Sequence, residues 1–92
     1  MVGEGTTKPG DNVHEVGLAA EILAIVQHAA QKAGMTTVTR IKVVVGEQLM
    51  VIPEALQFAF SFIKENSCAR KAALEIGSTS GREMYVDYVE GE

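Results

Sequence analysis

Residues 13–19 read VHEVGLA and begin the first regular pattern in this chain of 92 residues. From there to Ala33, apolar residues recur every three or four positions, which is the spacing of one helix face. Residues 1–12, with the sequence MVGEGTTKPGDN, have no apolar period and are rich in glycine, threonine and charged residues. The pattern predicts a flexible arm over residues 1–12, followed by a helix from about His14 to Lys32.

Three later segments show the two-residue alternation of a strand, at residues 38–45, 71–76 and 83–89. Residues 77–81 read GSTSG, a composition typical of a turn, so the second and third strands are expected to form an antiparallel hairpin. The sides predicted to be buried carry Thr39, Ile41, Val43 and Val45; Ala72, Leu74 and Ile76; and Met84, Val86 and Tyr88. The opposite, open side would carry Arg40, Lys42, Glu75, Asp87 and Val89.

A second helix is predicted to begin at Pro53, because proline lacks the N–H that would have no partner at the first helical position. Its apolar stripe is formed by Leu56, Ala59, Phe60 and Ile63. Phe58 and Phe62 widen this stripe. The three phenylalanines are therefore expected in the core, and a partner-binding patch is the alternative.

The element order is helix, strand, helix, strand, strand, which predicts an α+β fold. The first two strands and the helix between them form a crossover unit, so these strands should be parallel and the crossover right-handed. We therefore expect a small three-stranded mixed sheet with two helices on one face.

Composition excludes several classes of protein. The formal net charge is −4 and the basic residues are scattered, so no surface for nucleic acid or an anionic membrane is expected. Cys68 is the single cysteine, which excludes an internal disulfide and fits a reducing compartment. No apolar run reaches the ~18–20 residues of a membrane span, and no secretory signal is recognised. Because no nucleophile–base pair or phosphate loop stands out, we expect a cytoplasmic protein that is not an enzyme.

Five stretches in a fixed order resemble the hydrogenase nickel-incorporation proteins, the HypA/HybF family of metallochaperones. They are His14-Glu15-x-x-Leu18-Ala19, Val38-Thr39-Arg40-Ile41, Pro53-Glu54-Ala55-Leu56, Ala73-Leu74-Glu75-Ile76 and Gly81-x-Glu83-Met84. The resemblance implies that residues 13–92 form the family's nickel-binding domain, with Ni(II) as cargo. It also implies two partners, a maturation GTPase and the large subunit of a nickel–iron hydrogenase.

The chain departs from the family between its second and third strands. Family members carry a zinc module there, with two Cys-x-x-Cys pairs. Here the short linker of residues 77–81 takes its place, so no structural zinc is expected. Both a natural turn and a designed linker fit this sequence.

The family's nickel motif is Met-His-Glu at the extreme N-terminus, where the α-amine, a backbone amide and the imidazole bind Ni(II), an ion that suits nitrogen ligands. The resemblance therefore makes His14 and Glu15 the candidate metal residues. Thirteen residues precede His14, and Val13 replaces the family's methionine, so weaker binding is expected. Removal of residues 1–12 would expose Val13 as a new N-terminus and rebuild the family's arrangement.

Each candidate residue also has a simpler interpretation. His14 would be an exposed residue near the start of a helix, and Glu15 an acid that complements the helix dipole in the first turn. His28 lies roughly 21 Å further along the same helix at 1.5 Å per residue, so it cannot share a metal with His14. Cys68 is expected to be inert. The sequence thus leaves two functions open: a nickel metallochaperone domain, or a diverged or engineered protein-interaction module of the same fold without metal function, which could form a homodimer.

Overall fold

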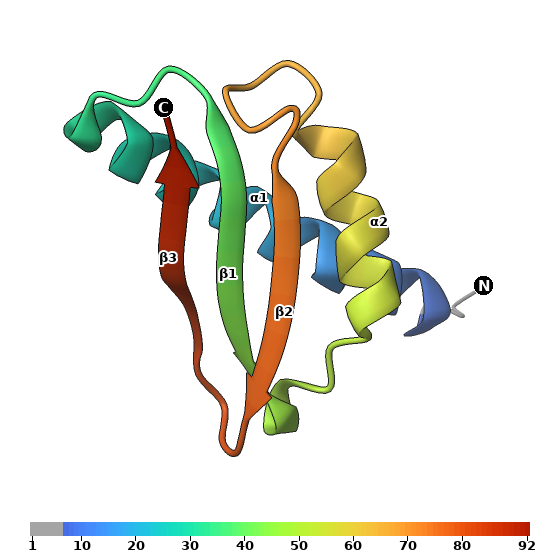
Figure 1. Cartoon of the computed structure of the whole chain (residues 1–92). Coiled ribbons are helices and arrows are strands. Elements are labelled where there is room, and N and C mark those ends of the chain that lie inside the picture. Colours follow the sequence, from blue (N-terminus) through green and yellow to red (C-terminus); the bar gives the residue numbers. More distant parts are fainter. Residues whose placement is uncertain (1–6) are drawn as a thin grey trace.

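Our computed structural model describes residues 7–92, with side chains from residue 14 onward. Helix α1 (Thr7–Ala33) passes behind a sheet of three strands, and helix α2 (Pro53–Ile63) lies beside the strand at one edge (Figure 1). The strands are β1 (Val38–Gly46), β2 (Ala73–Thr79) and β3 (Met84–Gly91). This arrangement confirms the predicted α+β fold with a mixed sheet.

Helix α1 begins at Thr7 and not near His14. Residues 7–12 of the predicted arm are therefore helical, whereas residues 1–6 lie outside the described residues, and the flexibility of the arm stays a prediction. The helix ends at Ala33, and the following residue, Gly34, has a φ of 74°, a conformation that glycine adopts without strain. There the amides of Gly34 and Met35 donate to the carbonyls of Gln31 and Ala30, at 3.2 and 2.8 Å. These two bonds form a Schellman cap, which satisfies carbonyls at the end of α1.

The order of the strands is β2-β1-β3, with β1 parallel to β2 and antiparallel to β3. The parallel pairing that follows from the crossover unit is confirmed, but the predicted hairpin of the second and third strands is wrong. A short turn does connect β2 to β3, but it carries the chain across the end of β1. Strand β3 therefore pairs with β1 and not with β2. Strand β1 has the most buried residues of the three, and in the central position it is paired along both edges.

The crossing requires a close approach of two backbone segments at Gly46. The Gly46 amide donates to the Glu83 carbonyl at 2.6 Å, and the Gln48 amide donates to the Gly81 carbonyl at 2.8 Å. A Cβ atom at position 46 would lie 2.5 Å from the Gly81 carbonyl oxygen. Glycine is therefore needed at the end of β1.

An irregular register reverses part of the predicted alternation. In the β1–β3 pairing, Lys42 lies opposite Tyr88 and Val43 opposite Val86, so Asp87 is an extra residue in β3. Such a bulge shifts the following side chains to the other face of the sheet. As a result Tyr88 is exposed and Val89 packs against the core, the reverse of the prediction.

A second register shift lies near the start of β1, between Val38 and Arg40. It buries Val38 and leaves Thr39 exposed, where Thr39 was predicted to be buried. The other apolar side chains that were predicted to be buried in β1 and β2 follow the alternation. They are Ile41, Val43, Val45 and Leu74, with Ile76 partly buried, and Ala72, directly before β2, is buried as well.

One hydrophobic core joins the inner face of the sheet to both helices. Helix α1 contributes a stripe at helical spacing, consisting of Ala19, Ile22, Val26 and Ala30. Helix α2 contributes Leu56, Ala59 and Phe60, as its apolar stripe predicts, and it begins at Pro53 as expected. The other two phenylalanines do not join them, because the Phe58 and Phe62 side chains are 72% and 74% exposed.

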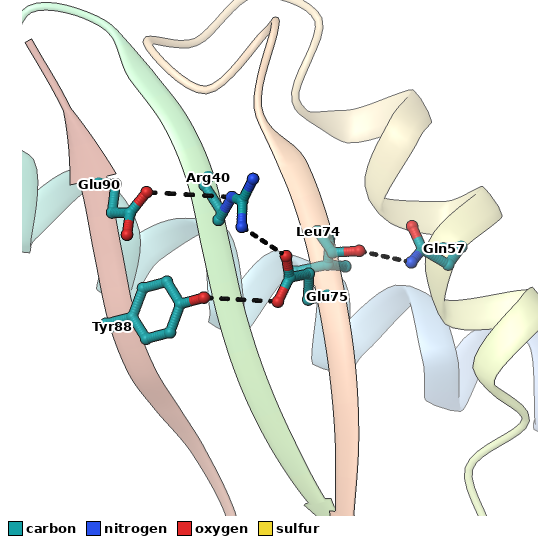
Figure 2. Close-up of polar contacts among 6 residues, drawn as sticks. All are labelled: Arg40, Gln57, Leu74, Glu75, Tyr88 and Glu90. Carbon is teal, nitrogen blue, oxygen red and sulfur yellow. Dashed lines mark hydrogen bonds and ion pairs between the residues drawn. The ribbon is translucent and has the colours of Figure 1, made fainter.

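The outer face of the sheet carries a small polar network centred on Arg40 (Figure 2). Its guanidinium lies 3.1 Å from the Glu75 carboxylate on β2 and 3.9 Å from the Glu90 carboxylate on β3. Tyr88 donates to Glu75 at 3.4 Å. Hydrogen bonding with Tyr88 and the charges of Glu75 and Glu90 raise the pKa of Arg40, which stays cationic. The prediction that Arg40 and Glu75 share the open face is confirmed, and their ion pair belongs to a network that links the three strands on the solvent side.

Candidate functional site

The two candidate metal residues lie side by side on α1 but face different surroundings. His14 is exposed, whereas Glu15 is only 2% exposed. Successive residues of an α-helix are about 100° apart around its axis, so the two side chains leave α1 in different directions. Only the imidazole of His14 is therefore presented to solvent.

The backbone of His14 is also different from that expected at a helix start. Because α1 begins at Thr7, His14 lies in its second turn. An amide at that depth donates to the carbonyl four residues earlier, and only the first four amides of a helix are free. The His14 amide is therefore used inside the helix.

The Glu15 carboxylate connects α1 to the start of α2. Its Oε2 accepts the backbone N–H of Ile52 at 2.9 Å. Ile52 is the N-cap residue of α2, and no side chain of its own caps that helix. The prediction that Glu15 sits in a first helical turn is wrong, because α1 starts eight positions earlier, at Thr7. The acid instead fixes the position of the second helix.

The other carboxylate oxygen of Glu15 has no such contact. Oε1 is buried and has no hydrogen-bond partner within the part of the chain that the structure describes. Native proteins satisfy nearly all buried polar atoms, so such an atom calls for an explanation. Sequence reasoning could not have found the contact between Glu15 and Ile52, because the two residues are 37 positions apart.

Glu15 also lines an apolar groove between the two helices. The groove has a volume of about 340 Å³. Its walls are formed by Glu15 and Val16 from α1, and by Ala55, Phe58, Ala59, Phe62 and Ile63 from α2. The Phe58 and Phe62 rings stack on each other, with centroids 6.3 Å apart and planes 19° from parallel. The alternative interpretation of the phenylalanine cluster, a partner-binding patch, therefore fits these two residues.

The remaining candidate ligands are not brought to His14. His28 is exposed further along α1, and Cys68 is a half-buried free thiol after α2. Among the side chains that the structure describes, those of residues 14–92, no three from histidine, cysteine, aspartate or glutamate are grouped closely enough to hold a metal ion. Nor does any helix within residues 7–92 have the length and hydropathy needed to cross a membrane.

Comparison with known proteins bears on residues 13–84. The model of a family described as "Hydrogenase/urease nickel incorporation, metallochaperone, hypA" matches this range. The description is that of a metallochaperone and not of an enzyme, in agreement with the sequence-based expectation.

Individual relatives give the same result. Over 64 residues, or 70% of this chain, it is 38% identical to the hydrogenase maturation factor HypA of Moorella thermoacetica and 41% identical to that of Archaeoglobus fulgidus. It is 36% identical to HypA of Paracoccus denitrificans over 78 residues, 85% of the chain. These matches cover 57%, 58% and 69% of the three relatives. The chain thus spans little more than half the length of the first two.

The fold is similar to solved structures of HypA proteins. The solution structure of the Ni metallochaperone HypA from Helicobacter pylori superposes with a TM-score of 0.75 at 18% identity, covering 84% of this chain and 96% of that one. A second HypA solution structure gives 0.70 at 19% identity, covering 87% and 97%. These structural similarities show a shared fold, and the sequence matches show the family relationship. From its match to the family model over residues 13–84, the chain belongs to the HypA family.

Proposed function

We propose that this chain is a nickel metallochaperone domain that takes part in the maturation of nickel–iron hydrogenase. The observation that carries this proposal is the family match over residues 13–84, which begins at the His14-Glu15 motif. The relatives named above are hydrogenase maturation factors. The exposed imidazole of His14 is also accessible to an ion that is carried as cargo.

Ni(II) would bind at His14, with Glu15 contributing its backbone amide more than its carboxylate. The exposed imidazole of His14 suits this role, because imidazole is a common ligand for nickel. The carboxylate of Glu15 is already bonded to the Ile52 amide. The amides at positions 14 and 15 are inside α1, so they become nickel ligands only where the turns before His14 unwind, or where the chain begins at Val13.

The test is a Ni(II) titration of four chains, followed by calorimetry and by the absorbance of square-planar nickel. They are the full chain, a chain that begins at Val13, and the His14→Ala variant of each. We expect tight binding by the Val13 form, weaker binding by the full chain, and loss of binding with His14→Ala. The matched control is His28→Ala, because His28 is also an exposed histidine on α1.

Two outcomes would overturn this assignment. If His14→Ala binds nickel as tightly as its parent, the metal lies elsewhere. If neither parent binds nickel, the chain has no metallochaperone function of this kind. Deprotonation of the α-amine and imidazole accompanies binding, so the affinity of the Val13 form should rise with pH near the amine pKa of about 8.

The proposed partners are a maturation GTPase and the large subunit of the hydrogenase, and the proposed compartment is the cytoplasm. The alternative is an interaction module of the same fold that binds no metal and forms a homodimer. The exposed Phe58 and Phe62 favour a role in protein interaction. Light scattering with and without nickel separates the two: a dimer that forms without nickel, in a chain that takes up none, supports the alternative.

A further inference from the structure

The groove between α1 and α2 combines an apolar lining with a polar atom that lacks a partner. Glu15 is the single charged residue among the seven that line it, and Glu15 Oε1 is buried without a hydrogen bond from any described residue. Phe58 and Phe62 leave about three quarters of their side chains in solvent. Large exposed aromatic side chains beside a concave apolar surface are typical of an interaction site.

The chemistry of the lining specifies the chemistry of a ligand. An apolar side chain would pack against the stacked rings of Phe58 and Phe62 and the small residues Ala55 and Ala59. A carboxylate oxygen accepts hydrogen bonds only, and a cationic donor makes the strongest ones. No basic residue lines the groove to meet Glu15. The groove therefore fits a ligand that carries both an apolar and a cationic group.

A second copy of this chain fits less well. In a two-fold interface the same patch meets itself, so two Glu15 carboxylates would enter one apolar contact without a basic residue from either groove lining. The net charge of −4 on each copy adds to the repulsion. Charge complementarity favours a different protein.

We propose that this groove docks a segment of a partner protein in which an apolar side chain lies close to an arginine or lysine. The apolar side chain enters between α1 and α2 against Phe58 and Phe62, and the cation donates to Glu15 Oε1. Because Glu15 is only 2% exposed, the donor reaches it when side chains that line the groove change rotamer. Docking here does not depend on nickel, although His14 is next to Glu15 in sequence.

The experiment selects ligands from a phage-displayed library of random 12-residue peptides, with the full chain as bait and the Phe58→Ser/Phe62→Ser double variant for counter-selection. We expect the enriched peptides to combine an apolar residue with arginine or lysine. Affinities measured by fluorescence polarisation should fall about tenfold or more with Phe62→Ser. Ile25→Ser is the matched control, because Ile25 is 40% exposed on α1 and lies outside the groove.

A double-mutant cycle isolates the contact with Glu15. Changing the peptide's arginine to glutamine should weaken binding to the parent about tenfold, and much less to the Glu15→Gln variant. The proposal is overturned if no such peptides are enriched, or if the peptides bind Phe62→Ser as tightly as the parent. It is also overturned if the arginine-to-glutamine change in the peptide weakens binding to Glu15→Gln as much as to the parent. If Glu15→Gln does not fold, the Phe62→Ser and peptide measurements on the parent still decide.

Two other occupants would be recognised by their own signs. A second copy would appear in sedimentation as self-association that Phe62→Ser abolishes. An intramolecular occupant would appear as a peptide affinity that rises about tenfold when residues 1–12 are removed. Either result would replace the proposed partner. Nickel uptake is measured separately, so a failure of nickel binding and a failure of docking are distinguishable.

Discussion

Glu15 shows how one side chain can hold two helices in place. Its Oε2 accepts a hydrogen bond from the amide of Ile52, the N-cap residue of α2, which has no partner within that helix. Glu15 connects α1 to the segment that leads into α2, and it also lines the groove between the two helices. The shape of the groove between α1 and α2 should therefore depend on this contact.

Replacing Glu15 with alanine should lower the free energy of unfolding by about 1–3 kcal/mol, because the Ile52 amide loses the charged acceptor of a partly buried hydrogen bond. Glu15→Gln keeps an acceptor at this position, so its decrease in the free energy of unfolding should be smaller. Urea unfolding followed by circular dichroism measures both changes, and Glu21→Ala, at an exposed position on α1, is the control. Equal stability of Glu15→Ala and the parent would show that the contact does not hold α2.

At the level of helices and strands, local patterns in the sequence predicted most of the fold but not the central position of β1. Local patterns were sufficient for the start of α2 at Pro53, for the three strands and for the parallel pairing of β1 with β2. The hairpin prediction failed because a turn composition at 77–81 says where the chain bends, and not which strand it pairs with next. Sheet order depends on which apolar strand gains most from a central position, which is a property of the whole sheet.

Two further failures have local physical causes. The bulge at Asp87 adds one residue to β3, so the strict alternation used for prediction assigned Tyr88 and Val89 to the wrong faces. At the candidate site, the motif His14-Glu15 could be found by resemblance, but the role of Glu15 could not. Its carboxylate is bonded to the Ile52 amide, which lies 37 residues away.

Strand β1 yields a prediction at its last residue. Gly46→Ala should lower the free energy of unfolding by about 1–3 kcal/mol, the usual range for overpacking, because the new Cβ atom would meet the backbone of Gly81 at 2.5 Å. Gly77→Ala is the matched control: its nearest neighbour is the flexible Lys42 side chain, 3.1 Å from the added atom. Thermal unfolding of both variants measures the difference. A Gly46→Ala variant as stable as Gly77→Ala would contradict the observed crossing.

The domain as a whole rests on one core shared by both helices and the sheet. At about 0.05–0.15 kcal/mol per residue, the 80 residues of the predicted domain, 13–92, have a stability of roughly 4–12 kcal/mol. The stability lost through a single large cavity in the core is therefore a substantial fraction of this total. Surface side chains of the same chemical type contribute little to the stability. The cost of a substitution therefore distinguishes residues that maintain the fold from residues available for binding.

Phe60 and Phe62 test that separation, because they are the same residue on the same helix with exposures of 1% and 74%. Phe60→Ala should cost about 3–5 kcal/mol, since it removes a fully buried ring and leaves a cavity among residues of α1, α2 and the sheet. Phe62→Ala should change stability by less than about 0.5 kcal/mol. Chemical denaturation of the two variants measures both values, with tyrosine fluorescence and circular dichroism as coincident probes of a two-state transition. If Phe62→Ala destabilises the chain as much as Phe60→Ala, the exposed pair belongs to the core and the groove is not a free surface. If the costs separate as expected, any loss of partner binding in a Phe62 variant reports on docking and not on folding.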